Sequence, residues 1–297
     1  MRRRTLPSIA TITLLLALVA GCAESSGTAG PGRLAVVATT TVVADFARVV
    51  GGDLVAVTGL LKPNTDPHDY EPSAADSVAV STADVIVSSG LGIDAWLDAV
   101  IHSAEPRARV TVASNGARIR PGDPHLWHDP RNAKVMVDNI AAAFETADKA
   151  HAGTYAANAN AYTAQLDRLD TEIATRIDGL ADKRLVTNHD AFGYYVDRFG
   201  MTYVGSVIPS FDSSAELSAE QVASLVSAIR DQRVRAVFSE HSLPPRAAAA
   251  IAKEAGVRVV AGDGALYGDG LGGPGSGAAT YLEMMRHNTD AIVDNLS

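Results

Sequence analysis

The chain has 297 residues, of which 47% are hydrophobic, and its 34 acidic residues against 25 basic ones give a net charge of −9. The length is ample for two domains with substantial cores. The acidic balance, without an Arg-rich helix or basic patch, argues against a nucleic acid partner. A single cysteine excludes an internal disulfide and a thiolate metal cluster.

The N-terminus has the pattern of an export signal. Three arginines at residues 2–4 precede an apolar run at residues 9–20, and Val-Ala-Gly-Cys at residues 19–22 has the form of a lipobox. The apolar run is short for a membrane span. We predict a lipoprotein signal peptide over residues 1–21, lipidation of Cys22 and a flexible tether over residues 22–33. Removal of the signal changes the net charge to about 22 − 34 = −12.

After the tether, short β-branched runs alternate with helical stretches. Strands are predicted at residues 34–39, 54–58, 84–88 and 109–112, and helices at residues 42–50, 73–81 and 94–103. Such alternation is typical of βαβ units with a parallel sheet. We assign residues 34–150 to an N-terminal α/β lobe.

Residues 129–178 contain no convincing strand. Their apolar residues recur at spacings of three and four, at Tyr155, Ala159, Tyr162, Leu166, Leu169, Ile173 and Ile177. This stripe predicts one long amphipathic helix, within residues 151–181, that packs along both lobes. Because a continuous helix is stiff, we expect the lobes to close on a ligand by a small adjustment.

The βα alternation resumes at residue 182. Strands are predicted at residues 184–187, 202–207, 235–239 and 257–260, and helices at residues 192–199, 219–232, 245–255 and 280–295. Residues 182–297 therefore form a second α/β lobe. The predicted fold is α/β, with two parallel-sheet lobes joined by one long rigid helix.

The tripeptide Asp-Pro-His occurs twice, at residues 66–68 and 123–125, in a chain with 8 His. Proline restricts its own φ and the residue before it, so each imidazole leaves the backbone in a set direction. A turn with an exposed His is the simpler interpretation of one copy. Two copies, each followed by an aromatic residue and an acid, favour a metal site.

Two further candidate ligands lie in the second lobe. His189 follows a predicted strand, as His68 does in the first lobe, and ligands of open α/β sheets bind beyond the carboxyl ends of the strands. His125 lies in the loop before a further helix, which we predict to begin near residue 130, and Asp269 lies in the glycine-rich segment 262–277. Two ligands from each lobe would form one metal site in the cleft between them.

Three other classes of protein share parts of this pattern. A zinc hydrolase could use such ligands to activate water, but His-Glu-x-x-His is absent and no spacing places Glu71 or Glu240 as a base. A dinucleotide enzyme could use Gly-x-Gly-x-x-Gly at residues 268–273, although Asp269 would repel a pyrophosphate there. A surface adhesin would share the signal and the tether but would not need four convergent ligands.

Six sequence blocks carry a family resemblance. They are Asn-Thr-Asp-Pro-His-Asp-Tyr-Glu-Pro at 64–72, Asp-Pro-His-Leu-Trp at 123–127, His-Asp-Ala-Phe-Gly-Tyr-Tyr at 189–195, Phe-Ser-Glu at 238–240, Leu-Tyr-Gly-Asp at 266–269 and Tyr-Leu-Glu-Met-Met-Arg-His-Asn at 281–288. Through them, residues 34–296 resemble the zinc- and manganese-binding solute-binding proteins of bacterial ABC transporters, periplasmic solute-binding protein family 9.

The resemblance implies one metal ion held by His68, His125, His189 and Asp269. It also implies a protein that is not an enzyme, is held at the outer face of the cytoplasmic membrane by a lipid on Cys22, and passes its metal to an ABC permease driven by a partner ATPase. We expect a monomer. Three imidazoles and one carboxylate favour Zn²⁺, with Mn²⁺ next and iron still open.

Four carboxylates are candidates to hold the distal N–H of the ligand imidazoles: Asp66, Asp123, Asp190 and Glu240. For Asp66 and Asp123, local turn or cap bonding is an equal alternative. Two further histidines lie near the candidate ligands in sequence. We expect His128 at the surface and His241 to point toward the cleft. The glycines beside Asp269 predict a mobile loop from which metal release begins.

Overall fold

The computed structural model describes residues 32–215 and 217–297. The predicted signal peptide, Cys22 and all but the last two residues of the predicted tether lie outside these ranges. Within them, no helix combines the length and the apolar character that crossing a membrane requires.

The first lobe contains one parallel sheet of four strands. These are β1 (Leu34–Ala38), β2 (Val55–Gly59), β3 (Val85–Ser88) and β4 (Val110–Val112), in the spatial order β2-β1-β3-β4. All three neighbouring pairs are parallel. The sheet order places β1 and β3 at the centre, and both strands are buried Val- and Ile-rich runs, as a sheet covered on two faces requires.

The helices of the first lobe are α1 (Thr41–Gly51), α2 (Ala74–Thr82), α3 (Leu97–Ala104) and α4 (Pro130–Ala147). The helix predicted from residue 94 begins only at Leu97. The reason is the buried Asp94, whose carboxylate accepts hydrogen bonds from the Ser89 N–H and the Thr39 hydroxyl, at 2.7 and 2.6 Å. Asp94 therefore fixes the turn after β3 instead of starting the helix.

The second lobe repeats the parallel arrangement. Its strands are β5 (Arg184–His189), β6 (Thr202–Ile208), β7 (Ala236–Phe238) and β8 (Arg258–Val260), and its helices are α6 (Gly193–Phe199), α7 (Ala219–Asp231), α8 (Arg246–Ala255) and α9 (Tyr281–Leu296). β5 pairs with β6 and β7 with β8, both in parallel. β5 and β7 lie side by side, so the two pairs are neighbours.

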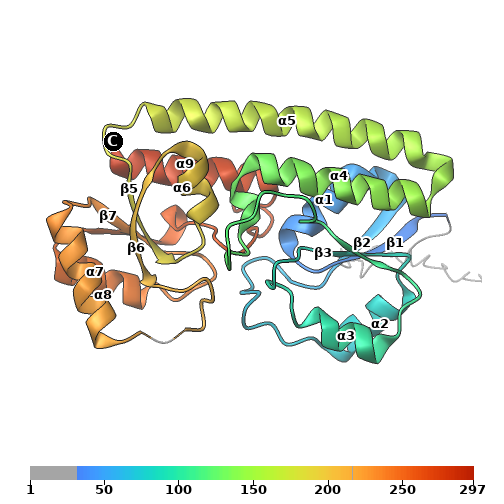
Figure 1. Cartoon of the computed structure of the whole chain (residues 1–297), viewed down its shortest axis with the longest axis horizontal. Coiled ribbons are helices and arrows are strands. Elements are labelled where there is room, and N and C mark those ends of the chain that lie inside the picture. Colours follow the sequence, from blue (N-terminus) through green and yellow to red (C-terminus); the bar gives the residue numbers. More distant parts are fainter. Residues whose placement is uncertain (1–31, 216) are drawn as a thin grey trace, which may run out of the picture.

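The predicted long helix is α5 (Ala152–Asp178), which runs along both lobes (Figure 1). At 1.5 Å per residue its 27 residues span about 40 Å. The seven stripe residues predicted from the sequence are its buried residues. The stripe packs on α1 and α4 of the first lobe and on α6 and α9 of the second.

The hydrophobic core continues from one lobe into the other. Phe46 of α1 lies edge-on to Tyr162 of α5 and Tyr281 of α9, with ring centroids 6.0 and 5.0 Å apart. The Tyr281 hydroxyl donates to the Trp127 carbonyl at 2.7 Å, and its backbone N–H donates to Asp45 at 2.9 Å. The lobes are thus joined by packing as well as by α5, which supports the expectation of a small closing motion.

Because α5 is stabilised by its buried stripe, we predict that Leu166→Ala lowers the free energy of unfolding by about 2–5 kcal/mol. Leu166 is fully buried in the shared core. Arg168→Ala, at an exposed position of the same helix, is the matched control and should change stability by less than about 0.5 kcal/mol. Urea unfolding followed by circular dichroism measures both. Equal midpoints for the two variants would contradict a stabilising role of the stripe.

Candidate metal centre

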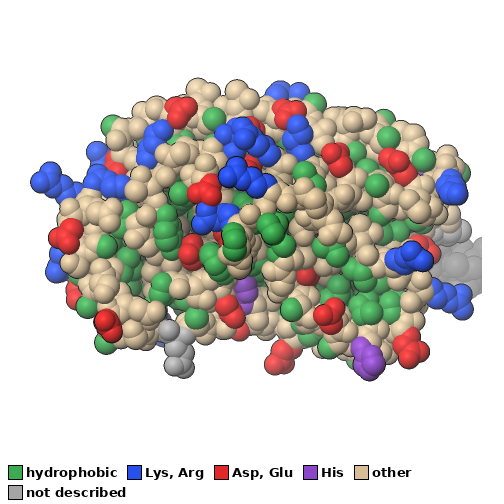
Figure 2. All heavy atoms as spheres, viewed as in Figure 1, with side chains coloured by type: hydrophobic (Ala, Val, Ile, Leu, Met, Phe, Trp, Pro, Cys, Tyr) green, Lys and Arg blue, Asp and Glu red, His purple; other side chains and the backbone are tan. Residues whose placement is uncertain are grey.

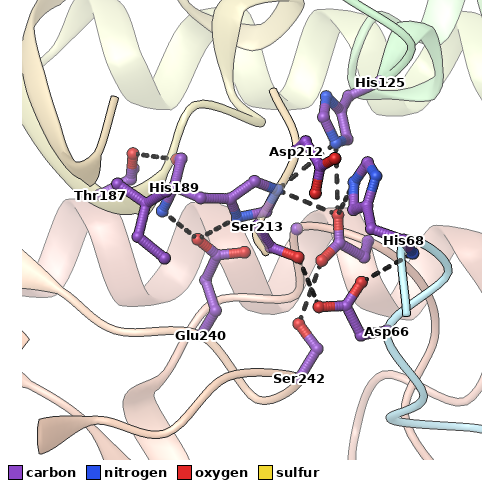
Figure 3. Close-up of polar contacts among 12 residues, drawn as sticks. Asp66, His68, His125, Thr187, His189, Asp212, Ser213, Glu240 and Ser242 are labelled. Atoms are coloured by element: carbon purple, nitrogen blue, oxygen red, sulfur yellow. Dashed lines mark hydrogen bonds and ion pairs between the residues drawn. The ribbon is translucent and has the colours of Figure 1, made fainter. Parts of the chain in front are cut away.

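Four side chains from the two lobes meet at the junction of the lobes (Figure 3). His68 comes from the loop between β2 and α2, and His125 from the turn that leads into the 3-10 helix η2 (Leu126–His128). His189 is the last residue of β5, and Asp269 lies in the loop between β8 and α9. His125 and His189 are 0% exposed and Asp269 is 2% exposed. Figure 2 accordingly shows little histidine on the face it presents, where acidic and basic side chains are interspersed.

The donor atoms of these side chains converge on one point. Oδ1 of Asp269 lies 3.1 Å from Nε2 of His189, 3.2 Å from Nε2 of His125 and 3.7 Å from Nε2 of His68. The Nε2 atoms of His125 and His189 are 3.4 Å apart. Four donors at zinc-like bond lengths around a tetrahedral ion are separated by about 3.3 Å. The spacing therefore suits one small ion at the centre.

The charges of these side chains depend on one another. Burial alone would lower the pKa of His189, but Asp269 and Glu240 hold it well above its ordinary value. Burial is likewise outweighed at His125, where Asp123 and Asp269 raise the pKa. Burial would raise the pKa of Asp269, yet the imidazoles, His189 above all, hold it well below its ordinary value. Asp269 is therefore an ionised carboxylate that faces the imidazoles.

Two carboxylates orient two of the imidazoles. Oδ1 of Asp123 accepts from the backbone N–H of His125 at 3.0 Å and lies 2.9 Å from its Nδ1. Oε1 of Glu240 does the same for His189, with both distances 2.9 Å. A carboxylate on Nδ1 keeps the proton there and leaves the Nε2 lone pair free toward the centre. Both candidate positions thus have the geometry expected of carboxylates behind ligand imidazoles.

The other two candidate carboxylates lie differently. Oδ1 of Asp66 accepts from the backbone N–H of His68 at 2.9 Å, which is the local turn bond, and Oδ2 accepts from the Ser213 hydroxyl across the cleft at 2.5 Å. Asp190 makes no side-chain hydrogen bond to any of the four central residues in the described part of the chain. Its pKa is raised by burial and by Asp123. The structure therefore brings Asp123 and Glu240 to the imidazoles but not Asp66 or Asp190.

Sequence reasoning missed three polar partners of the site. The Ser242 hydroxyl donates to Oδ2 of Asp269 at 3.2 Å, and Ser213 holds Asp66. The buried Asn288 amide clamps the backbone of Tyr267, accepting from its N–H at 2.8 Å and donating to its carbonyl at 2.9 Å. Ser242 lies just beyond the end of β7. Because ligands of open α/β sheets bind beyond the carboxyl ends of the strands, its position in the sequence could have predicted a place near the site.

The prediction that His128 lies at the surface is wrong. His128 is 0% exposed, and its Nε2 lies 2.8 Å from the carbonyl oxygen of Gly268. The η2 turn places it inside the junction of the lobes, a direction that linear spacing does not reveal. His241 stacks on Tyr267, with ring centroids 4.1 Å apart, and is not among the four converging side chains.

The mobility predicted for the loop beside Asp269 stays a prediction, but the structure shows a different role for its glycines. Neither Gly268 nor Gly270 adopts a positive φ. A Cβ at Gly268 would lie 2.0 Å from Oε2 of Glu240, and one at Gly270 would lie 2.6 Å from the Thr41 hydroxyl. These glycines permit close packing of a buried loop. The loop is also bonded to the first lobe, since Leu271 donates to the Thr41 hydroxyl at 2.8 Å.

Two α/β lobes that bring three imidazoles and one carboxylate together at their junction define a metal-binding solute-binding protein. Residues 36–295 match the family model "ZnuA: Zinc-uptake complex component A periplasmic". The chain belongs to this family, the metal-binding solute-binding proteins of ABC transporters.

Individual relatives differ in the metal that their names give. The chain is 31% identical over 283 residues to "Iron-binding protein YfeA" of Yersinia pestis, covering 92% of this chain and 89% of the relative. It is 32% identical over 294 residues to "Manganese-binding lipoprotein MntA" of Bacillus subtilis, with coverage of 93% and 94%. The solved structure of the periplasmic zinc-binding protein TroA from Treponema pallidum superimposes with a TM-score of 0.83 at 26% identity, over 90% of this chain and 100% of that one.

Some carboxylates around the site are bonded to a candidate ligand imidazole and others are not, so a pair of substitutions can test the effect of that bond on metal affinity. We predict that Glu240→Gln lowers metal affinity about 10–100-fold, because His189 loses the charge behind its Nδ1–H. Asp190→Asn, which alters a neighbouring half-buried carboxylate without a bond to the imidazoles, should change affinity less than about threefold. Competition against a chelator of known affinity measures both. Equal losses in the two variants would show that general charge, and not the bond to His189, matters.

Proposed function

We propose that this protein captures one divalent transition metal ion outside the cytoplasm and delivers it to an ABC permease for import, with His68, His125, His189 and Asp269 as the ligands. The observation that carries the proposal is the convergence of four buried donor atoms at the junction of the lobes, all within 4.8 Å of one another. In this role the protein binds and releases its cargo without chemical change, and a partner ATPase supplies the energy.

Zinc is the favoured cargo, with manganese next. Three neutral imidazole nitrogens and one carboxylate oxygen suit zinc, whereas manganese prefers more oxygen ligands in an octahedral arrangement. Oδ2 of Asp269 accepts a hydrogen bond from Ser242, so only Oδ1 faces the imidazoles. This favours one oxygen ligand over two. The manganese and iron in the names of relatives keep those metals as alternatives.

The proposed cellular location rests on the N-terminal sequence. A lipid on Cys22 would hold the protein at the outer face of the cytoplasmic membrane, with residues 22–33 as the tether. Two observations support this placement: the lipobox and the word "lipoprotein" in the name of the Bacillus subtilis relative. We propose that the protein acts there as a monomer.

Elemental analysis of the mature chain, purified in detergent and dialysed, tests the proposal. We expect one equivalent of metal per chain, and we expect zinc to displace manganese in competition. Absence of bound metal, together with no uptake of added zinc or manganese, would overturn the carrier function. Displacement of zinc by manganese would overturn only the choice of metal. Hydrolytic turnover by the zinc form would favour a hydrolase instead.

A further inference from the structure

A second buried imidazole lies beside the candidate ligands. His128 is three residues after His125 on the same tight turn, where the backbone N–H of His128 donates to the carbonyl of His125 at 3.2 Å. Both side chains are 0% exposed. The turn therefore carries two buried imidazoles. His125 is one of the four converging side chains, whereas His128 lies elsewhere in the junction of the lobes.

His128 contacts both segments of the second lobe that bear a candidate ligand. Its Nε2 lies 2.8 Å from the carbonyl oxygen of Gly268, the residue before Asp269. Its ring stacks on Phe192, three residues after His189, with centroids 4.5 Å apart and planes inclined by 28°. One side chain of the first lobe thus contacts the two segments of the second lobe that bear the candidate ligands.

The hydrogen bond requires an N–H donor at this position. A carbonyl oxygen only accepts, so Nε2 of His128 carries the proton and Nδ1 does not. Burial lowers the pKa of His128 to about 4, which keeps the ring neutral in this tautomer at neutral pH. An apolar side chain of similar size would fill the space but would leave the buried Gly268 carbonyl without this donor.

The loop between β8 and α9, which bears Gly268 and Asp269, makes other hydrogen bonds to the first lobe further along the chain. Leu271 donates to the Thr41 hydroxyl at 2.8 Å and accepts from the backbone N–H of Asn64 at 3.2 Å. These contacts hold the loop two residues after Asp269. The bond from His128 holds it one residue before Asp269, so the carboxylate lies between two anchored points.

We infer that His128 is a positioning residue: its bond to Gly268 and its stacking on Phe192 hold Asp269 and His189 against the two ligands of the first lobe and so slow the loss of bound metal. The inference rests on the proposed function. These contacts must break before the lobes separate. His128 therefore acts on metal release more than on capture.

The test compares three variants of the mature protein loaded with zinc. His128→Leu removes the donor and the ring, and we expect the zinc off-rate, measured by stopped-flow transfer to a chelator, to rise about tenfold with the on-rate changed less than about threefold. His128→Gln can donate through its amide and should recover most of the loss. His102→Leu, the same kind of change at an exposed position of α3, is the matched control and should behave as the parent.

The visible spectrum of the cobalt-substituted protein separates positioning from stability. A displaced Asp269 should change the coordination, and hence the band intensities, in His128→Leu, whereas a purely structural role would lower the unfolding midpoint and leave the spectrum as it is. An unchanged off-rate and spectrum in folded His128→Leu would overturn the inference while leaving the carrier function intact.

Two further outcomes also decide the matter. If His128→Leu does not fold, Phe192→Leu removes the stacking partner and keeps the hydrogen bond, and an off-rate equal to that of the parent would then overturn the inference. If the parent protein binds neither zinc nor manganese, the proposed function fails first, and the inference with it.

Discussion

Replacement of His125 by Ala is expected to lower the affinity for zinc by at least about a thousandfold, well beyond the loss that follows removal of an outer partner. The change removes one of the four donors, and the imidazole that is lost is fully buried. It also leaves Asp123, which is 1% exposed, without its imidazole partner. Chelator competition measures the affinity, and circular dichroism shows whether the variant is folded.

His189→Ala provides the complementary measurement from the second lobe. If both lobes bind the same ion, the two substitutions should have similar effects although the residues lie 64 positions apart. His102→Ala, on the exposed face of α3, should bind zinc as the parent does. Retention of full affinity by folded His125→Ala would show that the ligand set is wrong. A loss in His125→Ala alone would place the ion within the first lobe.

The two Asp-Pro-His copies show how far sequence reasoning reaches. In both, the Asp carboxylate accepts from the backbone N–H of the His two residues later, at 2.9 Å for His68 and 3.0 Å for His125. That turn is local and was predictable from the tripeptide. Only Asp123 also reaches its imidazole, whereas the second oxygen of Asp66 is taken by Ser213. The difference comes from a residue about 150 positions away, which no local pattern contains.

The fold was more accessible to prediction than the inner surface of the cleft. Periodicity alone identified the buried stripe of α5, and the strand-end rule placed His68 and His189, because both signals depend on neighbours in sequence. The burial of His128 and the close packing of Gly268 depend on which segment of the opposite lobe faces them. Such contacts arise only when the lobes assemble.

Acidification is expected to release the metal, and to begin doing so above the pH at which a free imidazole titrates. A metal-bound imidazole has no proton on Nε2, whereas the metal-free one can take a proton there, so a falling pH favours the metal-free state. The pKa values of His125 and His189 in the metal-free protein are raised by their carboxylate neighbours, despite burial. Protons therefore compete at a higher pH than the ordinary value of about 6.5 would indicate.

Each proton that the ion must displace makes the metal affinity fall about tenfold per pH unit. Below the pKa values of His125 and His189, the affinity should therefore fall about a hundredfold per pH unit. Zinc affinity measured from about pH 8 to about pH 5, with the chelator's own protonation corrected, tests this. Glu240→Gln should shift the onset to lower pH while weakening binding overall, because Glu240 both orients His189 and raises its pKa. An affinity that stays constant over this range would contradict the imidazole ligands. The carboxylates that prepare these imidazoles for a metal also make them better bases, so the same contacts that strengthen capture at neutral pH make release sensitive to acid.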